Sequence, residues 1–161
     1  MSVLKCNYSN KEQSLLKELV KGQHPLTCVI CCSDSRVIPE KIFDKTFGEL
    51  FVIRTAGNVI NEGELASIEY ALEHLKVKEV IVLAHTHCGA IHASIHQEKS
   101  KYMDVILNRI YKNISGEINE TKASELNAKK EVSYLKDKFN NHQDKFIATI
   151  YDIEKLEVRT I

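Results

Sequence analysis

The chain of 161 residues has no excess charge of either sign and no long apolar run. Lysine and arginine together number 22, as do aspartate and glutamate, so no overall field attracts nucleic acid or an anionic membrane surface. No apolar run approaches the roughly 20 residues of a membrane-spanning helix. The opening MSVLKCNYSN is too polar for a secretory signal. We therefore expect a cytoplasmic protein with no nucleic-acid or membrane partner.

Repeats, low-complexity tracts and linkers rich in proline or glycine are also absent, with only 2 prolines and 6 glycines in the chain. Nothing in the composition divides the sequence, and its length suffices for a core of its own. The hydrophobic fraction of 43% and the charged fraction of 27% are those of a globular protein. We expect a single domain over residues 1–161.

Continuous apolar runs predict strands that are buried on both faces of a sheet. Three such runs, and two further strands expected near the C-terminus, span residues 26–32, 49–55, 79–85, 145–152 and 155–161. Capping residues or helical spacing predict helices in residues 9–22, 62–75, from 89 onward and in 120–140. This alternation predicts an α/β fold around a mainly parallel sheet.

Two segments carry weaker signals. Residues 97–119 show little periodicity, so no element is predicted there. Residues 117–138, EINETKASELNAKKEVSYLKDK, mix charges of both signs. We interpret this stretch as the solvated face of a helix, which could also contact a partner subunit, and assign it no function.

Chemistry-bearing residues collect at the ends of two predicted strands. Cys32 ends the first strand, His85 ends the third, and Cys88 follows three residues later. Ligands of open α/β sheets bind at the carboxyl ends of strands, so these side chains converge if the two strands are neighbours. Two thiolates and an imidazole with no evident fourth protein ligand are typical of a catalytic zinc site. We therefore predict one Zn²⁺ per chain.

Two other cysteines, Cys28 and Cys31, lie within the first strand. The odd total of 5 cysteines argues against a disulfide framework. Cys28 is about 13 Å upstream of Cys32 along a strand, too far to share its metal. Reactive redox pairs sit at the start of a helix after a strand. We interpret both residues as core, and a thiol redox protein that uses them ranks last among the alternatives.

Asp34 and Arg36 follow Cys32 closely enough to act beside the same metal. The guanidinium can hold the carboxylate by a bidentate pair and keep its pKa low. The carboxylate can then either bind the metal or accept a hydrogen bond from a hydroxide on it. By itself, an Asp-x-Arg sequence is equally typical of an ordinary turn-end salt bridge.

The segments CSDSRVIPE (32–40), GELFVIRTAGN (48–58) and HTHCGA (85–90) resemble the signature segments of the β-class carbonic anhydrases. The resemblance implies that Cys32, His85 and Cys88 are zinc ligands and that Asp34 and Arg36 form a gating dyad. It also implies about four parallel strands plus a C-terminal antiparallel strand, flanked by helices. A homodimer, which can form a dimer of dimers, is the implied assembly.

The activity that the resemblance implies is the zinc-dependent reversible hydration of carbon dioxide to bicarbonate and a proton. A zinc-bound hydroxide attacks carbon dioxide, while Asp34 orients the hydroxide and Arg36 holds Asp34. Binding of Asp34 to the metal would close the site, so we expect low activity at pH 7 that rises at alkaline pH. Two further alternatives stay open: a hydrolase of carbon disulfide or carbonyl sulfide, and a non-catalytic zinc-binding regulatory module.

Overall fold

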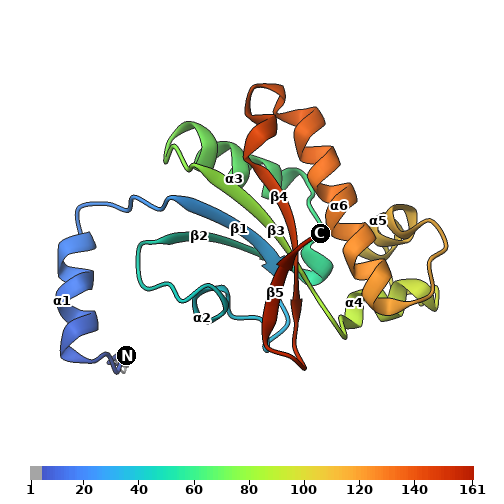
Figure 1. The fold of residues 1–161 in the computed structure, drawn as a ribbon, viewed down its shortest axis with the longest axis horizontal. Coiled ribbons are helices and arrows are strands. Elements are labelled where there is room, and N and C mark those ends of the chain that lie inside the picture. Colours follow the sequence, from blue (N-terminus) through green and yellow to red (C-terminus); the bar gives the residue numbers. More distant parts are fainter. Residues whose placement is uncertain (1–4) are drawn as a thin grey trace.

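The computed structural model describes residues 5–161 and contains a five-stranded sheet in the order β2-β1-β3-β4-β5 (Figure 1). The strands are β1 (Thr27–Cys32), β2 (Leu50–Thr55), β3 (Glu79–His85), β4 (Phe146–Asp152) and β5 (Glu157–Thr160). Strand β1 pairs in parallel with β2 and β3, and β3 pairs in parallel with β4. Strand β5 is antiparallel to β4. The α/β fold with four parallel strands and a C-terminal antiparallel strand is confirmed.

Helices flank this sheet on both sides and at one end. They are α1 (Asn10–Leu19), α2 (Pro39–Ile42), α3 (Glu62–Glu73), α4 (Gly89–Ile95), α5 (Asp104–Ile114) and α6 (Glu120–Lys138). Two 3₁₀ segments, η1 (Ala56–Asn58) and η2 (Asn140–Lys145), precede α3 and β4. None of the helices in residues 5–161 combines the length and the apolar character needed to cross a membrane.

Helix α5 lies in the segment where the sequence predicted no element. Its buried side chains are Leu107, Ile110 and Ile114, which have helical spacing. Exposed apolar residues in and beside the helix, including Val105 and Tyr111, obscure that spacing in the sequence. Apolar residues on the solvent side therefore explain why the helix was missed.

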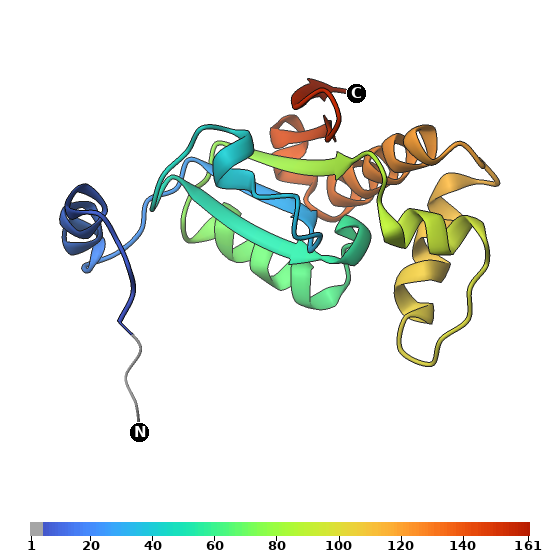
Figure 2. The same ribbon diagram turned by 90° about the horizontal axis from the view of Figure 1, so that it is seen from below.

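One face of the sheet holds the larger part of the core, beneath α3 and α6 (Figure 2). Ile68 and Leu72 of α3 and Leu135 of α6 are fully buried there against strand residues such as Ile30 and Val82. Each such side chain contributes about 1.5–3 kcal/mol of transfer free energy on burial. This face fixes the relative positions of β1 and β3, whose ends carry the predicted ligands.

Helix α6 corrects the interpretation of residues 117–138 as a solvated face. One side of the helix is buried, and its members are Ala123, Ser124, Asn127, Ala128, Glu131, Val132 and Leu135. Most of these residues are small or polar, so a hydropathy pattern does not reveal them as buried positions. Their polar groups are paired inside the protein, as described below.

Helix α1 begins at the predicted capping box, in which Ser9 and Glu12 bond each other's backbone N–H groups. It is set apart from the sheet at the end of an extended segment, as both ribbon views show (Figures 1 and 2). No residue of α1 is buried. Tyr8, which lies just before this helix, packs edge-to-face on Phe47.

Candidate metal centre

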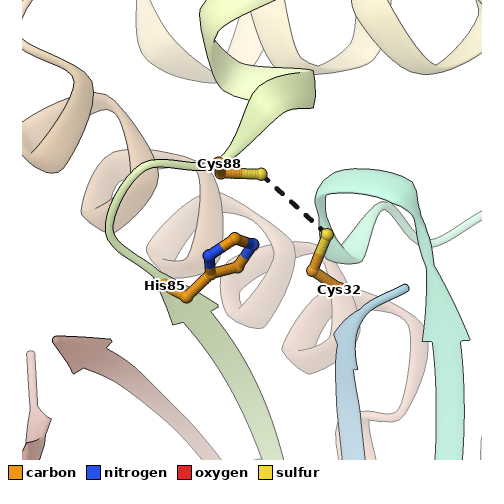
Figure 3. Close-up of side chains that lie close together, drawn as sticks. All are labelled: Cys32, His85 and Cys88. Carbon is orange, nitrogen blue, oxygen red and sulfur yellow. Dashed lines mark hydrogen bonds between the residues drawn. The ribbon is translucent and has the colours of Figure 1, made fainter. Parts of the chain in front are cut away.

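The predicted ligands lie at adjacent strand ends. The parallel register places Cys31 opposite Leu83, so the end of β1 at Cys32 lies beside the end of β3 at His85. The chain then turns, and Cys88 is the residue immediately before α4. Figure 3 shows the three side chains pointing toward one another from these separate segments.

The distances within this group suit a metal ion. The two sulfurs are 4.0 Å apart, and the ligand atoms of Cys32, His85 and Cys88 all lie within 4.8 Å of one another. Two sulfurs that bind one tetrahedral zinc at its usual bond length are separated by roughly 3.8 Å. Exposed fractions of 5%, 1% and 2% show that solvent is largely excluded from all three residues. The predicted convergence is confirmed.

The orientation of the His85 ring also fits a metal. Its Nδ1 lies 2.9 Å from the carbonyl oxygen of Thr86 and donates its proton to it. This leaves Nε2 with a free lone pair, and within the described chain Nε2 is buried without a hydrogen-bond partner. An unsatisfied buried nitrogen costs about 1–3 kcal/mol, and a metal bond would remove that cost. These residues therefore fit a zinc ion.

The close contact of the two sulfurs shifts the pKa values of the two thiols in opposite directions. The hydrogen bond with the Cys88 thiol and the backbone N–H groups of the surrounding turns lower the pKa of Cys32. The Gly57 N–H is one of these donors, at 3.3 Å from the Cys32 sulfur. The same sulfur–sulfur interaction, together with burial, raises the pKa of Cys88. Cys32 is thus the thiol of this pair that loses its proton more readily, and the thiolate is the form that binds a metal.

Asp34 and Arg36 form the bidentate pair that their spacing predicts. Arg36 Nε donates to Asp34 Oδ1 at 2.9 Å, and Nη2 donates to Oδ2 at 2.7 Å. The guanidinium holds the pKa of the Asp34 carboxyl well below its usual range. Arg36 also donates to the carbonyl oxygen of His87 at 3.0 Å, which ties the dyad to the loop between His85 and Cys88.

Arg54 is a site residue that the sequence reasoning missed. Its Nη2 donates to the carbonyl oxygens of Asp34 at 2.8 Å and Val37 at 2.9 Å, and its guanidinium also reaches the carbonyl of Cys32. These bonds pin the turn that carries the dyad. The available signal was the single charge in the apolar run LFVIRT (50–55).

Cys28 and Cys31 are fully buried inside β1, as the core interpretation requires. Burial raises the pKa of each thiol to about 12. Both are therefore poor nucleophiles, because the thiolate is the reactive form. Their environment argues against a redox pair.

The comparisons with known proteins agree on one family. The family model described as carbonic anhydrase matches residues 27–158. A carbonic anhydrase of Synechocystis sp. is 48% identical over 90 residues, which is 52% of this chain and 33% of that protein. Carbonic anhydrase 2 of Mycobacterium tuberculosis is 48% identical over 77 residues, which is 48% of this chain and 37% of that protein. The matched region thus spans only about a third of these relatives.

Solved structures share the fold over nearly the whole chain. The β-carbonic anhydrase CafA of Aspergillus fumigatus superposes with a TM-score of 0.83 and 26% identity, covering 94% of this chain and 82% of that one. The β-carbonic anhydrase CcaA gives a TM-score of 0.79 and 31% identity, covering 93% and 79%. The extent of the family match and the agreement in fold lead to one conclusion. This chain belongs to the β-carbonic anhydrase family.

Proposed function

We propose that this chain is a zinc enzyme that catalyses the reversible hydration of carbon dioxide to bicarbonate and a proton. The observation that carries the proposal is the buried group of Cys32, His85 and Cys88, whose unpartnered Nε2 lies beside two sulfurs. The Asp34–Arg36 pair next to it supports a catalytic role over a purely structural one. The names of the relatives agree with this activity.

A zinc ion with three protein ligands keeps one position for water and lowers the pKa of that water. The residues of this protein would hold the ion and orient the groups that react beside it. Two thiolates and a neutral imidazole balance the charge of the ion, so nearby hydrogen bonds have a large influence on its reactivity. Asp34 accepts a hydrogen bond from the reacting oxygen, and Arg36 fixes the direction of that carboxylate.

The Asp34–Arg36 pair is proposed as a gate. Both carboxylate oxygens are bound to Arg36 here, so Asp34 would leave one position on a bound zinc ion open to solvent. A swing of Asp34 away from Arg36 and onto the metal would close the centre. The expected rise of activity at alkaline pH depends on this swing and stays a prediction, which a pH–rate profile of the zinc-loaded protein tests. A flat profile from pH 6 to 9 would contradict it.

The proposed assembly is a homodimer, with a dimer of dimers as its larger form. The β-carbonic anhydrases of Sordaria macrospora are described as tetrameric, and they share the fold with a TM-score of 0.79. Sedimentation velocity measures the assembly directly. A cytoplasmic location likewise stays a prediction.

Zinc stoichiometry and stopped-flow hydration of carbon dioxide, measured on the same samples, test the proposal. We expect about one zinc per chain and catalysis in the wild type, and loss of both in Cys32→Ser. Asp34→Ala should keep zinc and lose about 10- to 100-fold of the rate, because it removes a group beside the metal ligands. A wild type that holds stoichiometric zinc but does not accelerate hydration would be a non-catalytic module.

Hydrolysis of carbon disulfide or carbonyl sulfide is the second candidate, because both are small linear electrophiles like carbon dioxide. The same zinc-loaded samples should be assayed with all three substrates. A larger kcat/KM for either sulfur compound than for carbon dioxide would replace the proposed substrate.

A further inference from the structure

A network of buried and half-buried polar side chains connects α5 and α6 to the turn beside the candidate metal centre. Asn127 of α6 has no exposed surface, and its Nδ2 donates to the carbonyl oxygen of Gly57 at 2.9 Å. The N–H of the same Gly57 donates to the Cys32 sulfur at 3.3 Å. A helix residue 70 positions away in sequence thus contacts the residue that bonds a metal ligand.

The direction of the Asn127 amide is determined by a second asparagine. Asn113 Nδ2 donates to Asn127 Oδ1 at 2.9 Å and to Glu131 Oε1 at 3.0 Å. Because Oδ1 of Asn127 accepts from Asn113, its Nδ2 must face the Gly57 carbonyl. The donor and acceptor of this side chain are therefore both used.

The end of this network that lies farthest from Gly57 is an ion pair. Arg109 Nε and Nη2 donate to the two carboxylate oxygens of Glu131 at 2.8 and 2.7 Å. Glu131 is fully buried, and the guanidinium of Arg109 also stacks on the ring of Tyr134 at 4.1 Å. A buried carboxylate left without its partner is strongly destabilising, so this end of the network is held firmly.

We propose that Asn127 is a positioning residue of the metal centre, which keeps the Gly57 N–H directed at the Cys32 sulfur. Asn113, Glu131 and Arg109 keep Asn127 itself in place. The inference rests on the proposed function only in taking Cys32 as a zinc ligand.

The Gly57 N–H would affect how the Cys32 thiolate binds a metal. Gly57 has a left-handed φ of 66° and no side chain. Its peptide groups are therefore held in place by hydrogen bonds and not by the packing of a side chain of Gly57. An N–H donor on a thiolate stabilises the charge on the sulfur and holds the sulfur in the position from which it binds a metal. Bonds of this kind around the ligands change metal affinity by about 10- to 100-fold.

The test compares Asn127→Ala and Asn127→Asp with Ser124→Ala. Ser124 is buried on the same helix one turn earlier, but its hydroxyl donates to the Glu120 carbonyl within α6 and does not touch η1. Asn127→Asp retains the shape and the acceptor for Asn113 but removes the donor to Gly57. Zinc affinity is measured by chelator competition, and the sulfur-to-cobalt charge-transfer band is recorded in cobalt(II)-substituted protein.

Both Asn127 variants should bind zinc at least 10-fold more weakly than the wild type and shift the charge-transfer band. Ser124→Ala should do neither, even where thermal unfolding of the metal-free protein shows an equal loss of stability. Wild-type affinity and an unshifted band in a folded Asn127 variant would overturn the inference. So would equal changes in Ser124→Ala.

A measurement on the wild type needs no variant to fold. In cadmium-113-loaded protein, a coupling between the metal and the Gly57 amide proton across the N–H···S bond is expected, and its absence counts against the inference. Tight zinc binding without hydration would refute the proposed function and leave this inference standing. Intact hydration together with unchanged zinc affinity in the Asn127 variants would refute this inference and leave the proposed function standing.

Discussion

At the scale of single residues, two of the candidate ligands, and Asp34 beside them, already have hydrogen-bond partners inside the protein. His85 Nδ1 donates to the Thr86 carbonyl, and the Cys32 sulfur accepts the Gly57 N–H. Asp34 is held by both arms of Arg36. Each side chain is therefore oriented before a metal binds, which reduces the ordering that binding must bring about.

The remaining cysteines give a prediction about reactivity. Iodoacetamide treatment of the native zinc-loaded protein at pH 8 should modify exposed Cys6 and leave Cys28 and Cys31 unmodified. Burial raises the pKa of both core thiols to about 12, so at pH 8 they stay protonated, and the reactive thiolate is scarce. Peptide mass spectrometry measures the modification, with unfolded protein as the control in which all sites react. A Cys28–Cys31 disulfide in native protein would revive the redox alternative.

At the scale of elements, the turn η1 determines how close α4 and α5 approach the centre. A Cβ on Gly57 would lie 2.7 Å from Ile110 Cδ1 of α5 and 3.1 Å from the Cβ of Ala90 in α4. The positive φ of 66° adds a second reason for glycine at this position. The left-handed turn and the close packing therefore depend on one residue.

Gly57→Ala should lower the free energy of unfolding by about 2–4 kcal/mol, because strain in the left-handed region adds to overpacking. The zinc affinity should fall as well, since the Gly57 N–H would move from the Cys32 sulfur. Urea unfolding and chelator competition measure the two effects. Gly63→Ala is the matched control: nothing lies within 4 Å of its added Cβ in α3, so its stability should be unchanged or slightly higher. Equal stability of the two variants would contradict the account of η1.

The sequence was most informative where residue type and periodicity agree. All five strands were predicted to within one or two residues at either end, three of them from continuous apolar runs. Cys32, His85 and Cys88 could be chosen because strand ends are the one place where such residues converge in this fold class. Arg54 and Asn127 could not be found in this way. Their roles arise from contacts with backbone carbonyls that are distant in sequence.

At the scale of the whole molecule, the candidate metal centre brings together two segments that are distant in the sequence. Cys32 and Cys88 are 56 residues apart in sequence, and the helices after them pack on different parts of the fold. An ion bound to both sulfurs would link the two ends of the segment from Cys32 to Cys88 in the native state. A ligand that binds only the folded protein stabilises it in proportion to the logarithm of its concentration.

Zinc should therefore raise the stability of the wild type by about 1.4 kcal/mol for each tenfold increase in free zinc above the dissociation constant. Thermal unfolding in a series of zinc buffers measures this dependence, starting from protein stripped with a chelator. Cys32→Ser should reach the same slope only at much higher zinc, because it replaces a thiolate by a hydroxyl. Cys6→Ser, at an exposed thiol that does not belong to the centre, should follow the wild type. A wild-type stability independent of zinc would mean that the ion does not bind the folded chain in preference to the unfolded one.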